Sequence, residues 1–264
     1  MDVSIIVINY NTLKMTNECI ESIIKNTKDI EYEIILVDNG SIDGSKDYFE
    51  TKTGIKYVYS SENLGFGRGN NLGLKKASGR NILFLNSDTL LINNAIKILS
   101  EYLDENAEVG ACGGNLYSID GKYESSFERY FPNLFSEFNT LLFGIPRVLL
   151  GRRNKMYNDT DTNIPVAYIC GADLLVKKKI LEDVGGFNPL FFMYLEETEL
   201  CYRISKNYKI MNVPAARIIH LCGGSQVKRK SPSRFFFESK QIYIDIVSPN
   251  VIYKFFKFRE LITA

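Results

Sequence analysis

The chain has 264 residues, of which 45% are hydrophobic and 24% charged, and these ordinary globular values leave room for a substantial core. Its formal net charge of +1 gives no global basic field, so we expect no nucleic-acid partner. The five cysteines are scattered without a CxxC pair, which argues against a disulfide framework and against a zinc cage.

The N-terminal run "VSIIVINYN" begins directly with strand-like residues. It has no basic region and no cleavage site, so we expect no signal peptide. No apolar stretch reaches the ~18 residues of a membrane-spanning helix. Together with the unpaired cysteines, these features predict a cytoplasmic protein, and they leave peripheral contact with a membrane open.

Strand and helix patterns alternate in the first half of the chain. The expected helices are Met15–Ile24, a short helix ending at Lys76, and Ala95–Leu103. They fall between expected strands at Ser4–Ile8, Glu33–Val37, Ile55–Tyr59, Asn81–Leu85 and Val109–Gly113. This alternation predicts an α/β fold with a mainly parallel central sheet flanked by helices, whose strand ends meet along one rim.

The regular alternation of strand and helix patterns ends after residue 114. Residues 127–157 combine aromatic residues and leucines with a basic cluster, and residues 251–261 again mix aromatic and basic residues. Two interpretations fit: an excursion packed over the domain, or a segment on an anionic membrane surface. The rest of this half predicts strands at Val166–Cys170, Ile210–Val213 and Ile218–Leu221, and helices at Lys178–Val184 and Glu197–Lys206.

Three polar clusters follow expected strands: Asn9–Asn11, Asp38–Ser41 and Asn86–Asp88. Asp and Asn are also common in turns and helix caps, and for Asp38 alone the turn is the favoured interpretation. Ligands of open α/β sheets bind at the carboxyl ends of the strands. Three such ends on neighbouring strands therefore favour a shared polar cleft.

The stretch "NLGFGRGNN" lacks the GxGxxG spacing of dinucleotide-binding folds and follows the third strand, which argues against a dehydrogenase. Its glycines, Arg68 and Asn70 could approach a phosphate, or they could form only a tight turn. Asp88 is a stronger signal, because a carboxylate at a strand end suits a divalent cation that also binds phosphate oxygens. His220 is the only histidine, and a lone histidine is usually structural.

Three acids open the helix expected near residue 197. Acids in a first helical turn complement the helix dipole, which explains any one of them. The aromatic residues before them would form a partly apolar wall that raises the proton affinity of a carboxylate, as a general base requires. The acids are Glu196, Glu197 and Glu199, and the aromatic residues are Phe191, Phe192 and Tyr194.

Taken together, these pieces resemble a family 2 glycosyltransferase of the GT-A fold, close to the bacterial rhamnosyltransferase-like members. The matching segments appear in the family's order and cover roughly residues 2–225. They are "SIIVINYN", "VDNGSIDGS", "ENLGFGRGNNLGL", "LFLNSDTLL", "ICGADLLVKKKILEDVGGFNPLFFMYLEETELCYRI" and "HLCGGS". The resemblance implies a nucleotide-sugar-binding half (1–114), an acceptor and catalytic half (115–225), and a basic, aromatic tail (226–264).

The resemblance also implies roles for single residues. Asn86, Ser87 and Asp88 stand in place of the DxD motif, with Asp88 and His220 holding Mg²⁺ or Mn²⁺. Glu197 matches the catalytic base, usually the Asp of a Glu-Asp pair, and the Glu196-Glu197 pair of this chain leaves open which glutamate serves. The remaining donor-site residues implied are Asn9, Tyr10, Asn11, Asp38, Asn63, Gly65, Arg68, Asn70, Gly171 and Ala172.

The implied reaction is an inverting transfer of a sugar, with rhamnose as first choice, from a dTDP- or UDP-sugar donor. The acceptor would be a hydroxyl of a saccharide, lipid-linked by analogy, in cell-surface polysaccharide synthesis. One alternative is a non-catalytic nucleotide-sugar-binding relative, suggested by Glu instead of Asp at position 197. Another is a nucleotidyltransferase, although "VINYNTLKMT" lacks the N-terminal Gly-rich loop usual in those enzymes.

Overall fold

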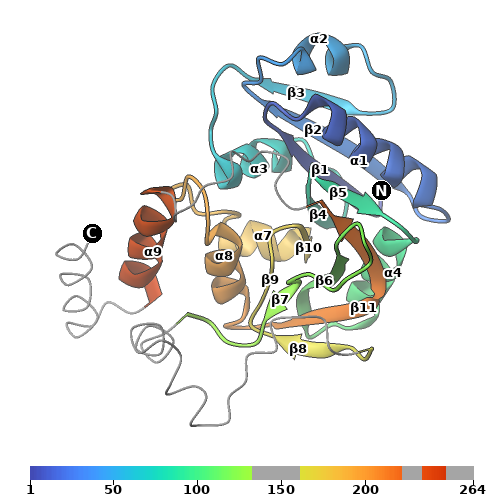
Figure 1. Cartoon of the computed structure of the whole chain (residues 1–264). Helices are drawn as coiled ribbons and strands as arrows, with labels where there is room; N and C mark the ends of the chain where they lie inside the picture. The colour runs from blue at the N-terminus through green and yellow to red at the C-terminus, as the bar shows by residue number, and fades with distance from the viewer. Residues whose placement is uncertain (133–160, 222–233, 248–264) are drawn as a thin grey trace.

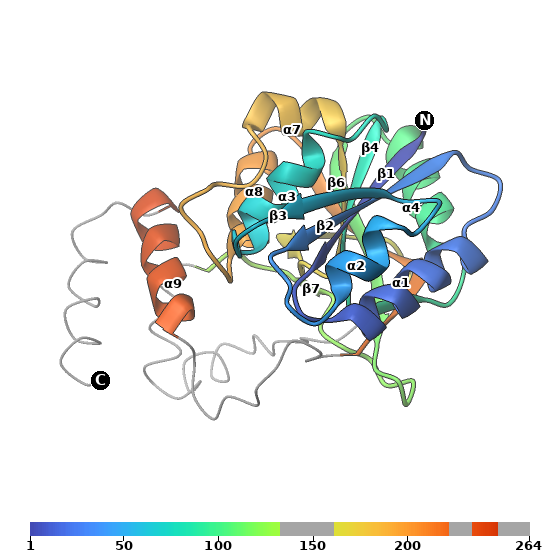
Figure 2. The ribbon, with the colours of Figure 1, turned by 90° about the horizontal axis from the view of Figure 1, so that it is seen from above.

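The structure, a computed structural model, describes residues 1–132, 161–221 and 234–247. In this part of the chain, a nine-stranded mixed sheet runs through the centre with helices packed on both faces (Figures 1 and 2). The strand order is β3-β2-β1-β4-β10-β6-β11-β5, and β8 also pairs with β11. The strands of this sheet are β1 (Val3–Asn9), β2 (Tyr32–Asn39), β3 (Lys56–Ser60), β4 (Asn81–Asn86), β5 (Thr89–Leu91), β6 (Val109–Tyr117), β8 (Ile164–Val166), β10 (Asp173–Lys177) and β11 (Lys209–His220).

The predicted α/β architecture is confirmed. Strands β1 to β4 are parallel to one another, and β6 and β11 form a second parallel pair. β10 lies between β4 and β6 and runs antiparallel to both, so that it joins the two parallel sets. The strands of βαβ units are buried on both faces, which explains why "SIIVI" and "EIILV" are almost continuously apolar.

Two hydrophobic clusters, one on each face of the sheet, hold the helices. The first cluster takes side chains from α1 (Leu13–Asn26), α4 (Ala95–Glu105) and, through Phe49, α2 (Ser45–Glu50). The second takes side chains from α7 (Lys178–Val184) and α8 (Glu196–Ile204). On that second face α3 (Phe66–Leu74) packs against β1 and β2, and Figure 2 shows α3 and α7 on the side of the sheet opposite α1 and α2.

The second half differs from the predicted elements. The strand expected over Val166–Cys170 is divided: β8 joins the main sheet, and β9 (Tyr168–Ile169) pairs with β7 (Phe127–Glu128) in a separate two-stranded sheet. β10 was not predicted, because its apolar residues run without a turn signal into the helical pattern that follows. The two strands expected after residue 209 are one strand, β11, whose register shifts between Asn212 and Arg217 around a Val-Pro step.

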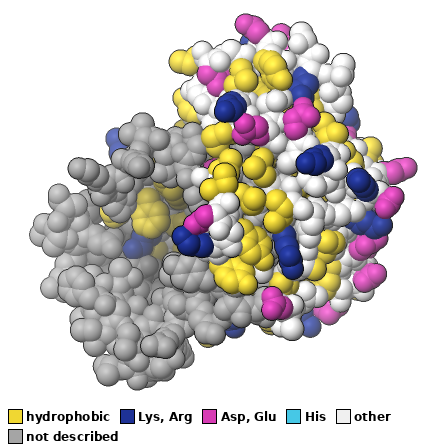
Figure 3. Space-filling model, turned by 45° about the vertical axis from the view of Figure 1, so that its right-hand side comes forward, with side chains coloured by type: hydrophobic (Ala, Val, Ile, Leu, Met, Phe, Trp, Pro, Cys, Tyr) yellow, Lys and Arg dark blue, Asp and Glu magenta, His cyan; other side chains and the backbone are white. Residues whose placement is uncertain are grey.

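The expectations about membrane contact rest mainly on residues outside the described part of the chain. Residues 133–157 and 251–261 both lie there. Within the tail, the structure shows an unpredicted helix, α9 (Arg234–Val247). Among the described residues, no helix has the length and apolar character needed to cross a bilayer. On the face shown in Figure 3, charged side chains of both signs are interspersed with hydrophobic ones, in keeping with the balanced composition.

Candidate functional site

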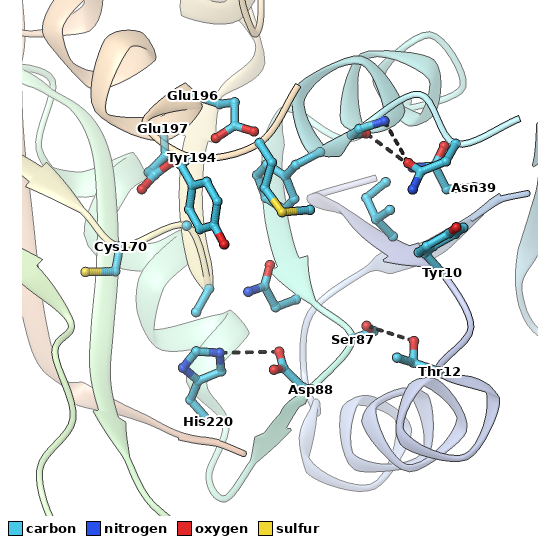
Figure 4. Close-up of a pocket in the computed structure, with 18 residues that line it drawn as sticks. Tyr10, Thr12, Asn39, Ser87, Asp88, Cys170, Tyr194, Glu196, Glu197 and His220 are labelled. Carbon is cyan, nitrogen blue, oxygen red and sulfur yellow. Dashed lines mark hydrogen bonds and ion pairs between the residues drawn. The ribbon is translucent and has the colours of Figure 1, made fainter. Parts of the chain in front are cut away.

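A cavity of about 320 Å³ lies where the polar ends of β1, β2 and β4 face the N-terminus of α8 (Figure 4). Tyr10 follows β1, Asn39 ends β2, and Asn86 ends β4, so three neighbouring strand ends contribute to one wall. Glu196 and Glu197 lie across from them at the start of α8. The cavity therefore brings the predicted strand-end clusters and the predicted glutamates to a single site.

Asp88 and His220 meet at one side of this cavity. The Nε2 atom of His220 lies 3.3 Å from Oδ1 of Asp88 (Figure 4). Strand pairing holds them there, because His220 is opposite Thr89 in the β5–β11 ladder and the backbone N–H of Leu221 donates to the carbonyl of Asp88 at 2.8 Å. Both side chains are partly exposed to the cavity, 16% for Asp88 and 21% for His220.

Gly171 and Ala172 connect the strand-end wall to α8. The backbone N–H of Asn86 donates to the carbonyl of Ala172 at 3.0 Å, which continues the β4–β10 pairing up to the cavity. A Cβ atom on Gly171 would lie 3.5 Å from Cδ of Glu197 and 3.7 Å from its Oε2. The Glu197 carboxylate thus lies directly over the backbone of Gly171, and both residues line the cavity.

The two glutamates point in different directions from the first turn of α8 (Figure 4). Glu197 lies over Gly171, whereas Glu196 lies toward α3, with its Cγ 3.5 Å from where a Cβ of Gly67 would be. Glu196 is buried, and its Oε1 has no hydrogen-bond partner among the described residues. Burial raises the pKa of both carboxyl groups, and the charge of Glu197 raises that of Glu196 further. A carboxylate with a raised pKa is a better proton acceptor.

The loop between Phe191 and α8 forms the remaining wall. The ring of Tyr194 projects into the cavity with its hydroxyl toward the centre (Figure 4). The loop is held against the Gly-rich segment, because the N–H of Phe66 donates to the carbonyl of Phe192 at 2.9 Å. Gly65 has φ +79°, and a Cβ there would be 2.2 Å from that carbonyl oxygen, so only glycine fits this approach.

Several predicted donor-site residues are brought to the cavity wall, and several are not. The wall includes Tyr10, Asn63, Gly65, Asn86, Ser87, Asp88, Gly171 and Ala172. Asn9 is buried in a network instead: its amide donates to Ser41 Oγ and its carbonyl oxygen accepts from Thr12 and Thr16. Asn11 accepts a hydrogen bond from the N–H of Ile42. These bonds shape the loop after β1 and are not directed at the cavity.

Asp38 is likewise buried and is occupied by turn and side-chain contacts. Its carboxylate accepts hydrogen bonds from the N–H of Ser41, at 3.0 Å, and from the hydroxyl of Tyr57, at 2.8 Å. The turn interpretation of Asp38 thus describes its observed contacts. Arg68 donates to the carbonyl of Leu64 and lines a different cavity, between α3 and α7. Asn70 is buried and donates to the carbonyl of Phe66.

Sequence reasoning missed part of the wall. Thr12 is within 3.3 Å of Ser87 Oγ, and the amide of Asn39 donates to Asn63 Oδ1 at 3.0 Å, which orders the Gly-rich loop. Asn39 belongs to the predicted cluster Asp38–Ser41 but was assigned no role of its own, and Thr12 directly follows the cluster Asn9–Asn11, so the strand-end rule could have found both. The contributions of Met193 and Cys170 had no such signal, since they depend on how distant segments pack.

Curated proteins with similar sequences carry glycosyltransferase names. The chain is 28% identical to the glycosyltransferase GlyG of Streptococcus pneumoniae over 190 residues, which are 70% of this chain and 60% of GlyG. It is 27% identical over 229 residues to the rhamnosyltransferase WbbL of Escherichia coli, covering 83% of each. An N-acetylglucosaminyl-diphospho-decaprenol L-rhamnosyltransferase of Mycobacterium tuberculosis is 25% identical over 202 residues, 71% of this chain and 66% of that protein.

Solved structures show the same fold at low identity. GalNAc-T7 with UDP, GalNAc and Mn²⁺ superposes with a TM-score of 0.66 at 15% identity, over 93% of this chain and 48% of that one. TarS 1–349 of S. aureus with UDP gives a TM-score of 0.62 at 19% identity, over 94% and 66%. These neighbours identify the fold as GT-A. The pattern of "Glycosyl transferase family 2" matches residues 4–185, more than half of the sequence, and the chain belongs to this family.

Proposed function

We propose that this protein is an inverting glycosyltransferase that moves a sugar from a nucleotide-diphosphate sugar to a hydroxyl group of a saccharide acceptor. One observation carries the proposal: the Asp88–His220 pair and the Glu196–Glu197 pair face the same cavity from opposite sides. Such a site has one place for a diphosphate and another for a proton acceptor. Membership of the family favours sugar transfer over nucleotidyl transfer.

The donor diphosphate would bind at the Asp88 side together with Mg²⁺ or Mn²⁺. Asp88 and His220 would hold the cation, since Asp88 Oδ1 and His220 Nε2 lie 3.3 Å apart on one side of the cavity. The described residues contain no group of three or more His, Cys, Asp or Glu side chains arranged as a metal site, so diphosphate and water oxygens would complete the coordination. The cation would supply neutralisation of the charge that builds on the departing diphosphate.

Glu197 is the base in this proposal. The acceptor oxygen attacks the anomeric carbon from the face opposite the diphosphate, and the acceptor O–H proton passes to the Glu197 carboxylate. The bond between the anomeric carbon and the diphosphate oxygen breaks, and its electron pair leaves with the nucleotide diphosphate. Glu197 is favoured over Glu196 because its carboxylate lies over Gly171, next to the end of β4, whereas Glu196 lies toward α3.

The finer assignment of substrates comes from the relatives. Two of the similar proteins are named rhamnosyltransferases, and the mycobacterial name contains N-acetylglucosaminyl-diphospho-decaprenol, a sugar linked to a lipid through a diphosphate. We therefore take rhamnose as the sugar and dTDP or UDP as the nucleotide. A lipid-linked oligosaccharide is the acceptor, which would place the protein in cell-envelope polysaccharide synthesis. Tyr10 is 41% exposed beside the strand ends, and its ring could stack on the nucleobase of the donor.

A donor screen tests the proposal. dTDP-rhamnose, UDP-glucose, UDP-galactose, UDP-N-acetylglucosamine and GDP-mannose are each added with and without Mn²⁺, and the thermal midpoint is recorded. A true donor raises the midpoint by mass action, and we expect the cation to enlarge the shift. The donor that binds is then offered to a decaprenyl- or undecaprenyl-diphosphate-linked sugar, and the product's anomeric configuration is read by NMR. Binding without transfer to any acceptor would favour a non-catalytic nucleotide-sugar-binding protein, and no binding at all would contradict the donor site.

A further inference from the structure

The backbone just before the two glutamates is held in an unusual conformation. Tyr194 has φ +76° and Leu195 has φ +66°, and neither is a glycine. Two consecutive residues in the left-handed region are disfavoured unless their surroundings fix them. Leu195 is the N-cap of α8, and its carbonyl accepts the hydrogen bond from the N–H of Glu199 at 3.0 Å. This segment therefore sets the direction in which Glu196 and Glu197 leave the helix.

The backbone carbonyl groups of Phe192 and Met193, just before that segment, each accept a hydrogen bond from a different part of the chain. The carbonyl of Phe192 accepts from the N–H of Phe66, at the start of α3 on the donor side of the cavity. The carbonyl of Met193 accepts from the hydroxyl of Ser239, in α9, at 2.7 Å. Ser239 is buried, with 2% of its surface exposed. The loop is thus held between the Gly-rich segment and α9.

Aromatic contacts strengthen the α9 side. The rings of Phe192 and Phe235 have centroids 4.8 Å apart, and those of Tyr194 and Phe236 are 5.9 Å apart in an edge-to-face arrangement. Figures 1 and 2 both show α9 next to α8 and the loop that leads into it. The contacts of α9 with residues 192–194 therefore fall on the three residues that precede the N-cap of α8.

We propose that α9 braces the strained loop and that Ser239 is a positioning residue, which keeps Glu197 aimed over Gly171 through its hydrogen bond to Met193. The proposal rests on the proposed function, since it assigns α9 a part in aligning the catalytic base. Ser239 does not itself line the cavity, and its hydrogen bond reaches the wall through the carbonyl of Met193, so it acts through the loop. The proposed donor diphosphate binds around Asp88, across the cavity from Glu197, so loss of the Ser239 hydrogen bond should affect donor binding less than kcat.

Ser239→Ala removes the hydroxyl and leaves the carbonyl of Met193 without this donor. Small displacements of a catalytic group are costly, and we expect kcat to fall on the order of 10-fold while the donor KM stays within about twofold. Ser239→Thr keeps a hydroxyl and should restore most of the lost kcat. Ser100→Ala is the matched control: Ser100 is also a buried serine in a helix, its Oγ accepts from the side-chain amide of Asn81 at 3.1 Å, at the end of β4 away from the cavity, and the kcat of this variant should equal that of the wild type.

A second measurement does not depend on activity. Hydrogen–deuterium exchange followed by mass spectrometry reports the opening of amides in a peptide spanning residues 190–200. We expect faster exchange of that peptide in Ser239→Ala, and no change there in Ser100→Ala. Unchanged kcat and unchanged exchange in Ser239→Ala would overturn the brace. An equal loss of kcat in Ser100→Ala would assign the effect to general destabilisation, which also overturns it.

The two proposals fail in distinguishable ways. If the wild-type protein transfers no sugar from any donor that it binds, the proposed function fails, and the exchange experiment still tests whether Ser239 orders the loop. If the wild type is active and Ser239→Ala behaves like the wild type in both measurements, only the brace fails.

Discussion

Nε2 of His220 lies 3.3 Å from Oδ1 of Asp88, although the two residues lie far apart in the sequence. The contact exists because the short strand β5 turns back after Asp88 and pairs with the end of β11. Asp88 immediately precedes β5, and His220 is the last residue of β11. The edge pairing of the sheet is therefore what forms the proposed cation site.

Removal of the Asp88 carboxylate should abolish the cation dependence of donor binding. We expect Asp88→Asn to weaken Mn²⁺-supported donor binding on the order of 100-fold, because loss of even an outer partner of a metal ligand typically costs 10- to 100-fold. His220→Asn should have a smaller effect in the same direction. Isothermal titration calorimetry of the donor with and without Mn²⁺ gives both affinities.

Asp120→Asn is the control for this charge change, since Asp120 is an exposed acid in a turn and is paired with Lys122. It should bind the donor like the wild type. If Asp88→Asn kept the full Mn²⁺-dependent gain in affinity, Asp88 would not be a ligand of the cation.

Substitution of Glu197 should lower kcat more than substitution of Glu196. Glu197→Gln preserves shape and removes the proton acceptor, so kcat should fall by about 10²–10⁴-fold with little change in donor affinity. Glu196→Gln should retain much more of the activity, because its carboxylate lies toward α3 and away from Gly171. Steady-state transfer assays and donor titration of both variants provide the comparison. A larger loss of kcat in Glu196→Gln than in Glu197→Gln would reverse the assignment.

Glu196 should reduce stability as the pH rises. Burial, and then the charge of Glu197, raise its pKa in the folded protein above the value of about 4.3 in the unfolded chain. Between these two values the folded state binds more protons, so the free energy of unfolding falls with increasing pH. Its contribution is fully favourable below the unfolded pKa and is lost as the pH rises through the folded pKa.

In Glu196→Gln the side chain at position 196 cannot ionise, so this variant should not show the Glu196-dependent fall in the free energy of unfolding. We expect its Tm to exceed that of the wild type by an amount that grows from pH 5 to pH 9, where about 1 kcal/mol corresponds to roughly 2–4 °C for a protein of this size. Differential scanning calorimetry across that range measures the gap. A gap that shrank with pH would contradict the raised pKa.

Gly65 should tolerate no side chain. Its φ of +79° and ψ of 179° belong to a region reached almost only by glycine, and a Cβ would be 2.2 Å from the carbonyl oxygen of Phe192. We expect Gly65→Ala to lower the free energy of unfolding by on the order of 3 kcal/mol or more, measured by chemical denaturation. Transfer activity should fall with it, because the displaced loop leads to Glu197.

Gly54→Ala is the control that distinguishes the cost of a left-handed backbone conformation from the cost of the steric contact with Phe192. Gly54 has a similar φ, +82°, but no heavy atom lies within 4 Å of the added Cβ. Its cost should be limited to the left-handed conformation, about 1–2 kcal/mol. Equal costs for the two substitutions would show that the contact with Phe192 contributes nothing.

Local patterns in the sequence determined most of the first half. Continuous apolar runs predicted β1, β2 and β4, because strands that are covered on both faces need hydrophobic residues on both sides. The polar residues after them predicted the rim of the cavity, and Tyr10, Asn86 and Asp88 do lie on its wall. The same rule could not tell wall residues from Asn9 and Asp38, whose short side chains turn into networks behind the rim.

Only the tertiary structure decided how distant segments complete the site. β10 enters the sheet between β4 and β6, and this placement, which local periodicity does not encode, brings Gly171 and Ala172 to the end of β4. The approach of His220 to Asp88 depends on the edge pairing of β5 with β11. The different directions of Glu196 and Glu197 depend on a strained loop, which long-range contacts with α3 and α9 hold in place. Such contacts carry no local sequence signal, because their stability comes from packing between segments far apart in the chain.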